Sequence, residues 1–206
     1  MFRQLKNKLH QMAAARLPEN ETRLQELGKL IDHLQEKKVK NLPLALNFIC
    51  THNSRRSHLA QAWAAAWVNY YQIDKLYVYS GGTEATALHP NALKVLQIDG
   101  FHIEALDTSS NPNYLLKTAS SDRGLRMFSK KFDAAQNPKS DFVAIMVCSD
   151  ADEACPYVPG CTLRIVLPYE DPKTSDGTAD EVATYLLRSR QIGVEMGFIM
   201  RKVAKS

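Results

Sequence analysis

The sequence predicts an α/β fold built on an open, doubly wound parallel sheet. From Leu44 onward, short apolar runs alternate with segments of helical periodicity, which is the pattern of βαβ units. The runs are continuous, as expected of parallel strands that are covered on both faces. In such a fold the site lies at the carboxyl ends of the strands.

We expect one domain from residue 44 to residue 206, in which strands and helices alternate. The expected strands are 44–49, 75–82, 141–148 and 162–169. The expected helices are 57–71, 89–100 and about 178–203. Pro90 suits the first turn of the second helix, and Thr178 with Glu181 has the spacing of a capping box at the start of the third.

Residues 1–43 are predicted to form an N-terminal helical extension. Two amphipathic helices joined by a turn at 18–20 would make a hairpin, and the Lys-rich stretch 36–41 is typical of a linker. The two apolar stripes are Phe2, Leu5, Leu9 and Met12, and Leu24, Leu27, Ile31 and Leu34. They must be buried on the domain or on a second copy, so a homodimer through these helices is one interpretation.

A second segment departs from the alternating pattern. We interpret residues 109–140 as an insertion, because a compact α/β unit uses short connections at such a place. Within it, residues 125–132 could add an edge strand after a turn at 122–124.

The composition excludes several classes of protein. A net charge of +4 is too weak to indicate nucleic-acid binding, but it is compatible with a small anionic substrate. No apolar stretch reaches the ~18–20 residues that a membrane helix needs. The basic N-terminus lacks the serine enrichment of a targeting peptide and leads into more helix, so we expect a cytoplasmic protein.

The chain has four cysteines, which are Cys50, Cys148, Cys155 and Cys161. Without a secretion signal, a disulfide framework is not expected, and the thiols are interpreted as free, reactive or redox-active. A zinc site would need closely spaced pairs, which the gaps between these cysteines do not provide. We therefore expect no metal and no cofactor, and we assign Cys161 to the core.

The stretch CTHNSRRS, residues 50–57, stands where a strand gives way to a helix. Loop N–H groups and a helix N-terminus at such a junction favour an anion, and they would lower the pKa of the Cys50 thiol below ~8.5. Arg56 offers a planar fork for two oxygens of a tetrahedral oxyanion. Ser57 can donate to the sulfur and Asn53 can pin the loop. We interpret this C-x5-R-S stretch as a nucleophile in an oxyanion cradle; the alternative is a buried core cysteine beside a surface arginine.

Two further segments emerge at the same end of the predicted sheet. Asp171 follows the fourth strand and could protonate a leaving oxygen, although an Asp-Pro alone is more often a turn. Cys148 ends the third strand, and Cys155 follows after a short Asp-rich loop. These thiols could attack an intermediate on Cys50 and pass the oxidation onward by thiol–disulfide exchange. The alternative is that both are buried hydrophobic residues.

Four segments together resemble the low-molecular-weight tyrosine phosphatase superfamily, and within it the thioredoxin-coupled arsenate reductases. They are FICTHNSRRS, YSGGTEATALHPNAL, CSDADEACP and YEDP. The resemblance covers about residues 44–203, apart from the insertion. The C-x5-R-S stretch and the Asp-Pro pair are shared by both branches, whereas the CSDAD…CP segment belongs to the reductases.

The resemblance implies a role for each of these residues. Cys50 would be the nucleophile, Asp171 the general acid, Cys148 the resolving thiol and Cys155 the relay thiol that thioredoxin reduces. The loop that binds the substrate would comprise Thr51, His52, Asn53, Ser54, Arg55, Arg56 and Ser57. Arsenate would form an adduct with Cys50, and attack by Cys148 would then expel arsenite.

The chain also departs from the family pattern. His52 replaces the usual glycine, and Arg55 replaces a small or cysteine position, so the loop is bulkier and more basic. We expect the Arg55 side chain to point to solvent or to the rim of the loop. Related reductases often hold a potassium ion beside the loop, but Gln61 and Ser110 stand where that site would have carboxylates.

A phosphatase acting on phosphotyrosine or on a small phosphate ester is the main alternative, because Cys50, Arg56 and Asp171 suffice for it. Tyrosine-specific relatives tend to place an aromatic residue directly after Asp-Pro, whereas Lys173 and Thr174 follow here, so we favour the reductase. A sensor that binds an anion without turnover is disfavoured, because nucleophile, arginine and acid are all present.

Overall fold

A sheet of four parallel strands, in the order β2-β1-β6-β7, forms the centre of the molecule. The strands are β1 (Leu44–Cys50), β2 (Leu76–Gly82), β6 (Phe142–Met146) and β7 (Cys161–Val166). This computed structural model describes residues 1–17 and 19–206, so part of the turn predicted at 18–20 lies outside the described residues. The predicted open parallel sheet is confirmed, and each predicted strand is present with slightly different ends.

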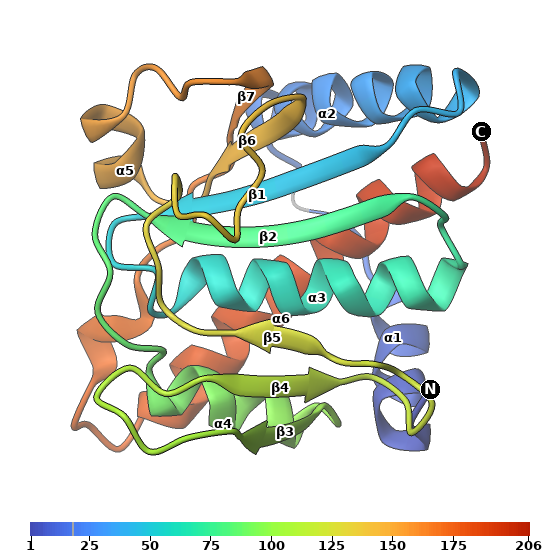
Figure 1. The fold of residues 1–206 in the computed structure, drawn as a ribbon. Helices are drawn as coiled ribbons and strands as arrows, with labels where there is room; N and C mark the ends of the chain where they lie inside the picture. The colour runs from blue at the N-terminus through green and yellow to red at the C-terminus, as the bar shows by residue number, and fades with distance from the viewer. Residues whose placement is uncertain (18) are drawn as a thin grey trace.

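Helices cover both faces of the sheet (Figure 1). On one side lie α3 (Arg56–Tyr71), α4 (Pro90–Ile98) and α6 (Glu181–Ala204). α2 (Glu21–Val39) lies on this side too, where it packs on α6 and on β7. The short helix α5 (Ser149–Ala154) lies on the other side, against β1 and β6. No helix of the described residues is long and apolar enough to span a membrane.

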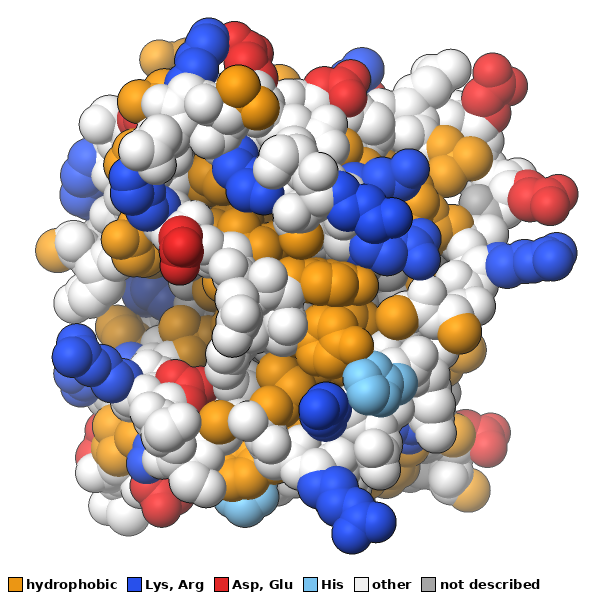
Figure 2. Space-filling view, turned by 90° about the vertical axis from the view of Figure 1, so that its right-hand side faces the viewer, with side chains coloured by type: hydrophobic (Ala, Val, Ile, Leu, Met, Phe, Trp, Pro, Cys, Tyr) orange, Lys and Arg blue, Asp and Glu red, His pale blue; other side chains and the backbone are white. Residues whose placement is uncertain are grey.

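The strand order reverses between β1 and β6. β2 lies next to β1 on one side, and β6 lies next to β1 on its other side. The carboxyl ends of β1 and β2 lie at the left of the molecule in Figure 1. At that end Cys50 pairs with Gly82, and the Val147 N–H donates to the Ile49 carbonyl at 2.9 Å. The loops after β1 and β6 therefore meet at the switch point of the sheet, where this class of fold forms its site. The opposite end of the molecule, drawn in Figure 2, carries apolar atoms between groups of Lys and Arg side chains.

The packing of α3 on α6 depends on two glycines. A Cβ atom at Gly197 would lie 2.5 Å from the Trp67 ring, and one at Gly193 would lie 2.9 Å from the Trp63 ring. The indole N–H of Trp67 donates to the Gly193 carbonyl at 2.8 Å. The absent side chains let two fully buried indoles lie directly on the α6 backbone, so this interface is dry and closely packed.

The two helices of the N-terminal extension are present as α1 (Arg3–Ala13) and α2, and both pack on α6. They lie at different sides of the molecule in Figure 1 and do not pack along each other as the predicted hairpin would. The buried positions of the stripes are Leu5, Leu9 and Met12 in α1, and Leu27, Leu30, Ile31 and Leu34 in α2. Leu24, expected in the second stripe, is 41% exposed.

This packing changes two other expectations for the extension, which are the linker at 36–41 and the homodimer. The stretch 36–41 is not a linker, because α2 continues through Val39 and the Lys38 ammonium donates to the Val203 carbonyl at 2.8 Å. The apolar stripes are buried within the chain itself, so a homodimer through these helices would not have them as its contact surface.

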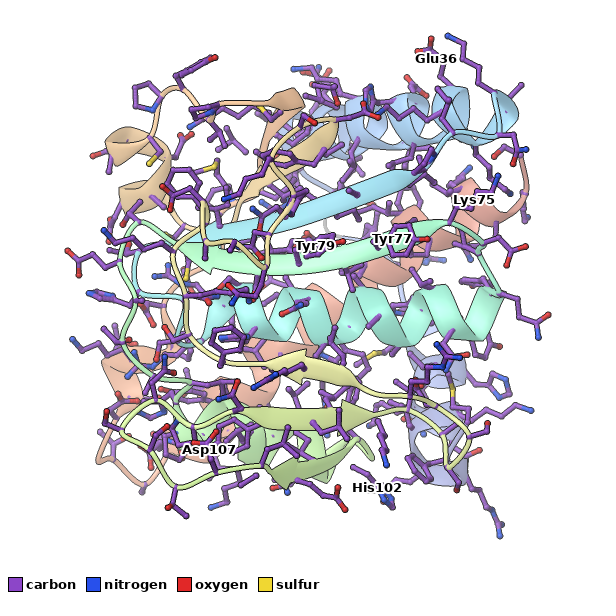
Figure 3. All side chains as sticks on the ribbon, in the orientation of Figure 1. Glu36, Lys75, Tyr77, Tyr79, His102 and Asp107 are labelled. Atoms are coloured by element: carbon purple, nitrogen blue, oxygen red, sulfur yellow. The ribbon has the colours of Figure 1, made fainter. Side chains whose placement is uncertain are left out.

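A second, antiparallel sheet lies beside α4. It contains β3 (His102–Ala105), β4 (Tyr114–Lys117) and β5 (Leu125–Met127), in that order. Figure 3 labels His102 and Asp107 at this sheet. The Asp107 carboxylate accepts hydrogen bonds from the side chains of Ser109 and Asn113, at 2.6 and 2.7 Å, and from the backbone N–H groups of both residues, and these bonds lower its pKa. Asp107 thereby closes the connection from β3 to β4.

The edge strand expected at 125–132 is divided between the two sheets. Residues Leu125–Met127 form the edge of the second sheet, and the chain then crosses to the end of β2. There the Gly82 N–H donates to the Lys130 carbonyl at 2.9 Å, and the Phe132 N–H donates to the Gly82 carbonyl at 2.8 Å. The segment 109–140 thus covers the carboxyl end of β2, next to the loop that begins at Cys50.

Two local predictions were wrong. The last helix has no capping box, because it begins at Glu181 after Asp180, and the Thr178 hydroxyl donates instead to the Ser175 carbonyl at 2.8 Å. The Asp-rich stretch after Cys148 is not a loop but the short helix α5. Acidic residues in a first turn favour a helix, because they face its partly positive N-terminus.

Candidate active site

The predicted anion loop, residues 50–57, connects the last residue of β1 to the first turn of α3. Cys50 is 4% exposed, and its sulfur lies 3.0 Å from the Ser57 hydroxyl. The Asn53 N–H donates to the same sulfur at 3.2 Å. Sulfur, loop N–H and hydroxyl therefore converge at one point, as the C-x5-R-S spacing predicts.

The carbonyl groups of the anion loop face outward. The Thr51 carbonyl accepts from the Glu84 N–H at 2.8 Å, the His52 carbonyl from the Ser129 hydroxyl at 2.9 Å, and the Ser54 carbonyl from the His89 N–H at 3.0 Å. Because each peptide group is planar and trans, a carbonyl that faces outward turns the N–H of the next residue inward. The loop thus offers the N–H groups of residues 52, 53 and 55 to an anion beside Cys50.

Asn53 pins the loop, as the sequence predicts. It has a positive φ of 45°, and its Nδ2 donates to the Ser57 hydroxyl at 2.9 Å. Its Oδ1 accepts from the Lys130 N–H at 2.9 Å, which ties the loop to the inserted segment. The loop also approaches β2 closely, since a Cβ atom at Gly82 would lie 2.6 Å from the Thr51 carbonyl oxygen. The loop is therefore held from three directions.

Arg56 and Asp171 meet across the site. Asp171 follows β7 and is the N-cap of a 3-10 turn, η1 (Pro172–Ser175), where it accepts from the Lys173 N–H at 3.0 Å. Its other oxygen accepts from Arg56 Nη2 at 2.7 Å, and Arg56 Nη1 donates to the Tyr169 carbonyl at 2.9 Å. The expected arginine and the expected acid are thus in direct contact, beside Cys50.

Burial raises the pKa of the Cys50 thiol, and the neighbouring Cys148 acts in the same direction. The Ser57 hydrogen bond and the charge of Arg56 lower this pKa but do not outweigh the burial. A lowered pKa of Cys50, expected from the loop, is therefore not what this arrangement gives. The guanidinium of Arg56 is paired with the Asp171 carboxylate and with the Tyr169 carbonyl, so its positive charge lowers the pKa of Cys50 less than an unpaired arginine would.

Of the two directions expected for Arg55, solvent is wrong, because the side chain is bonded to residues beside the loop. Its Nε donates to the Tyr185 hydroxyl at 2.6 Å and its Nη2 donates to Asp176 at 2.8 Å. The Tyr185 hydroxyl in turn donates to Asp176 at 2.7 Å, and His89 stacks on the Tyr185 ring. Burial raises the pKa of Tyr185 to about 12, so the phenol stays protonated as a donor. Arg55 therefore fastens the anion loop to α6 and to the segment that carries Asp171.

The other two predicted cysteines stand at the two ends of α5. Cys148 is fully buried as the N-cap residue, and its sulfur lies 3.5 Å from the Thr51 hydroxyl of the anion loop. Cys155 is the C-cap residue and is partly exposed. Cys161, assigned to the core, is partly exposed at the start of β7. All of these thiols are free. We call residues 148–155 the relay segment.

The N-terminal extension reaches the site along α6. Arg23 of α2 donates to the Pro168 carbonyl at 3.0 Å and to the Glu195 carboxylate at 2.7 Å. The Tyr169 hydroxyl donates to the same carboxylate at 2.7 Å, and both Glu195 and Tyr169 are buried. Because the Tyr169 carbonyl accepts from Arg56, the extension stabilises the segment that holds Arg56 in place.

The loop positions His52 and Thr51 line the outer side of the site, and Ser54 is buried. Gln61 does not offer a free oxygen for a cation, since its Oε1 accepts from the Ser80 hydroxyl at 2.7 Å and its Nε2 donates to the Val78 carbonyl at 3.1 Å. The residues present therefore do not fit the potassium site of related reductases.

Sequence reasoning missed the residues that brace the loop from a distance. They are Ser129 and Lys130 of the inserted segment, His89, Asp176 and Tyr185. The spacing of the sequence carries no signal for these contacts, because each partner is more than 30 residues away from the loop position that it touches.

Comparisons with known proteins identify the family of this chain. The family model of the low molecular weight phosphotyrosine protein phosphatases matches residues 45–119. An arsenate reductase of Shouchella clausii is 30% identical over 159 residues, which cover 77% of this chain and 94% of that protein. An arsenate reductase of Bacillus subtilis is 29% identical over 159 residues, with the same coverage.

Solved structures show the same fold. A low molecular weight phosphotyrosine phosphatase of Vibrio cholerae has a TM-score of 0.50 and 14% identity, and the match covers 77% of this chain and 94% of that one. Fold and sequence similarity define an enzyme of the low-molecular-weight phosphatase class. The chain belongs to the low-molecular-weight phosphotyrosine phosphatase superfamily and is close to its arsenate reductases.

Proposed function

We propose that this enzyme is an arsenate reductase that passes electrons through Cys50, Cys148 and Cys155 to thioredoxin. The single observation that supports this most is the position of Cys148. A buried free thiol at the end of the central sheet, in contact with Thr51 of the anion loop, has no part in phosphate-ester hydrolysis. The same thiol is well placed to attack a sulfur at Cys50.

The first half of the proposed reaction takes place in the anion loop. The Cys50 thiolate attacks the arsenic of arsenate, which is held by the inward N–H groups and by Arg56. Asp171 gives its proton to the departing oxygen, which leaves as water. The Cys148 thiolate then attacks the Cys50 sulfur, and the electron pair of the sulfur–arsenic bond passes to arsenic. Arsenic(V) is reduced to arsenite, and Cys50 and Cys148 are oxidised to a disulfide.

The second half moves the disulfide to the surface. The Cys155 thiolate attacks the Cys148 sulfur, and Cys50 leaves as a thiolate, ready for another arsenate. Thioredoxin then reduces the Cys148–Cys155 disulfide with its own dithiol. The partial exposure of Cys155 supports its role as the thiol that meets this partner, and a thioredoxin-dependent enzyme fits a cytoplasmic location.

The proposal is tested by single turnover of three proteins with arsenate. Wild-type enzyme should release arsenite and accumulate a Cys148–Cys155 disulfide until thioredoxin is added. Cys155→Ser should release one arsenite per enzyme and stall with Cys50 bonded to Cys148. Cys148→Ser should release none. Wild-type enzyme that forms no arsenite, but hydrolyses an aryl phosphate well, would overturn the reductase function.

A phosphatase is the second candidate, and one observation favours it. Cys50, Ser57, Arg56 and Asp171 form a complete set for transfer of a phosphoryl group, with the thiols of the relay segment taking no part. Aryl-phosphate hydrolysis that survives both Cys148→Ser and Cys155→Ser would belong to this activity. Its rate relative to arsenate reduction, measured side by side, decides which of the two is the main reaction.

A further inference from the structure

Arg164 of β7 forms hydrogen bonds to the C-terminal end of α5. Its Nε and Nη2 donate to the Cys155 carbonyl at 3.2 and 3.0 Å, and Nη2 also donates to the Asp152 carbonyl at 2.9 Å. The same guanidinium forms an ion pair with the Asp152 carboxylate. One side chain thus holds the last turn of the helix and the backbone of the exposed cysteine.

The helix depends on this arginine more than a longer helix would. It has six residues, which is too short to be stable by itself in water. The carbonyl groups of its last turn lack partners within the helix, and they carry the negative end of the helix dipole. The Arg164 guanidinium supplies donors and positive charge at that end. Its other end rests on Cys148, which makes no side-chain hydrogen bond to the helix backbone.

The helical form keeps Cys148 and Cys155 apart. Seven residues at 1.5 Å each separate their Cα atoms by about 10 Å along the helix, whereas a disulfide needs about 4.4–6.8 Å. The two thiols can therefore bond only when α5 opens at one end. Cys148 is buried at the sheet, so the end that can move is the one held by Arg164.

We propose that Arg164 is a latch that holds the relay segment in its helical, reduced form and whose release allows Cys155 to reach Cys148. The proposal rests on the relay of the proposed function, and it identifies a positioning residue for the second thiol exchange. Closed, the latch keeps Cys155 away from the disulfide until Cys50 has reacted with Cys148. Open, it frees the Cys155 backbone, and the attack on Cys148 proceeds with Cys50 as the leaving thiolate.

The electrostatics of the thiol are consistent with this geometry. Burial raises the pKa of the Cys155 thiol, and the charge of Arg164 is what opposes this rise. In the closed position Cys155 is thus mostly a thiol and a poor nucleophile. Opening of α5 exposes it to water, which removes the effect of burial.

The test compares Arg164→Met with wild type in two measurements that need no arsenate. The first is the rate at which iodoacetamide alkylates Cys155, measured by peptide mass spectrometry. The second is the ratio of Cys148–Cys155 disulfide to dithiol in a glutathione redox buffer. Loss of hydrogen bonds to a charged donor should raise both by about 10-fold. Arg164→Lys, which keeps the charge but not the fork, should give an intermediate value.

Two controls separate a latch from a general structural role. Arg126→Met removes an arginine of β5 that donates to Asn113, far from the relay segment, and should leave both readouts unchanged. Alkylation of Cys50 should also stay at the wild-type rate in Arg164→Met, since the anion loop is braced by other elements. A parallel rise at Cys50 would show general loosening of the fold and would overturn the latch.

The remaining outcomes distinguish the latch from the reaction. Equal Cys155 alkylation and equal disulfide ratios in wild type, Arg164→Met and Arg164→Lys would overturn the latch, whether or not arsenite is formed. If wild-type enzyme forms no arsenite but Arg164→Met still raises both readouts, the proposed function fails and the latch stands. If Arg164→Met does not fold, the Arg164→Lys protein decides by the same two measurements.

Discussion

The anion loop and the relay segment carry the two halves of the proposed chemistry, yet the fold holds them in opposite ways. The loop is braced by β2, by the inserted segment, by α4 and by α6, and its Cys50 is buried. The relay segment is a helix of six residues whose outer end is fastened by the single side chain of Arg164. One region is held by several elements, and the other depends at its outer end on one side chain.

The difference follows from what each step needs. Attack on an oxyanion needs N–H donors, arginine and acid that are already in position, because any reorganisation adds to the barrier. Exchange between thiols needs one sulfur to travel several ångströms and then meet a partner protein. A rigid loop beside a loosely held helix satisfies both needs within one small domain.

The largest expected effect is the loss of enzymatic activity when the cysteine of either region is replaced. Cys50→Ser should abolish both arsenate reduction and aryl-phosphate hydrolysis, because a hydroxyl is not ionised in this cradle. Cys155→Ser should stop only multiple turnover of arsenate. Steady-state rates of the two variants on both substrates check this. Measurable hydrolysis by Cys50→Ser would mean that the nucleophile lies elsewhere.

The next effect tests the arginine pair of the loop. Arg56→Lys should lower kcat/KM by about 10²–10³-fold, since a point charge cannot hold two oxygens and the Tyr169 carbonyl at once. Arg55→Ala should act mainly on stability, by about 1–3 kcal/mol, because it unfastens the loop from Asp176 and Tyr185. Kinetics combined with thermal unfolding distinguish the two roles. Equal kinetic losses in both variants would show that Arg55 also contacts the substrate.

A smaller effect compares the bracing of the two regions directly. Asn53→Ala should lower the free energy of unfolding by about 2–4 kcal/mol, since it removes two buried hydrogen bonds and places alanine at a positive φ. Asp152→Ala, in the partly exposed ion pair of the relay segment, should change it by less than about 1 kcal/mol. Urea unfolding of both variants gives the comparison. Similar losses would contradict the contrast drawn between the regions.

The last effect, small per pH unit, is a pH dependence of stability at His58, next to the anion loop. His58, in the first turn of α3, is fully buried, and burial lowers its pKa from 6.5 to about 3. Between these pH values the unfolded chain binds a proton that the folded chain does not, so stability falls as the pH falls from about 6.5 to 3. The slope from this group should be at most about 1.4 kcal/mol per pH unit. His58→Gln should flatten this slope in urea unfolding curves, and an unchanged slope would exclude His58 as its source.

Sequence reasoning predicts the part of the site that is local in the chain. Cys50, Asn53, Arg56 and Ser57 lie within one strand–loop–helix junction, so residue types and spacing are enough to assemble them. Asp171 could be added because parallel strands bring their carboxyl ends to one edge. The sheet and its flanking helices are predictable for the same reason, since periodicity reports burial on each segment.

What sequence reasoning could not predict depends on long-range contacts. The direction of Arg55 is set by Asp176 and Tyr185, which lie more than 100 residues away. Arg164 has no local pattern that would connect it to α5. The spacing of Leu24 predicts a buried position, but it is exposed, because spacing shows which residues share a helix face and not how much of that face another element covers. The raised pKa of Cys50 likewise comes from burial, which the loop sequence does not reveal.

The burial of α1 and α2 against α6 also has a consequence for how the chain is made. In the chain, α1 and α2 precede the parallel sheet, whereas α6 follows it, so the part of each apolar stripe that packs on α6 stays uncovered until α6 has been synthesised. The two N-terminal helices therefore cannot complete their packing as an early folding unit. A chain that stops before residue 181 would expose the part of both stripes that packs on α6 and should aggregate, which makes premature termination a direct route to degradation for this protein.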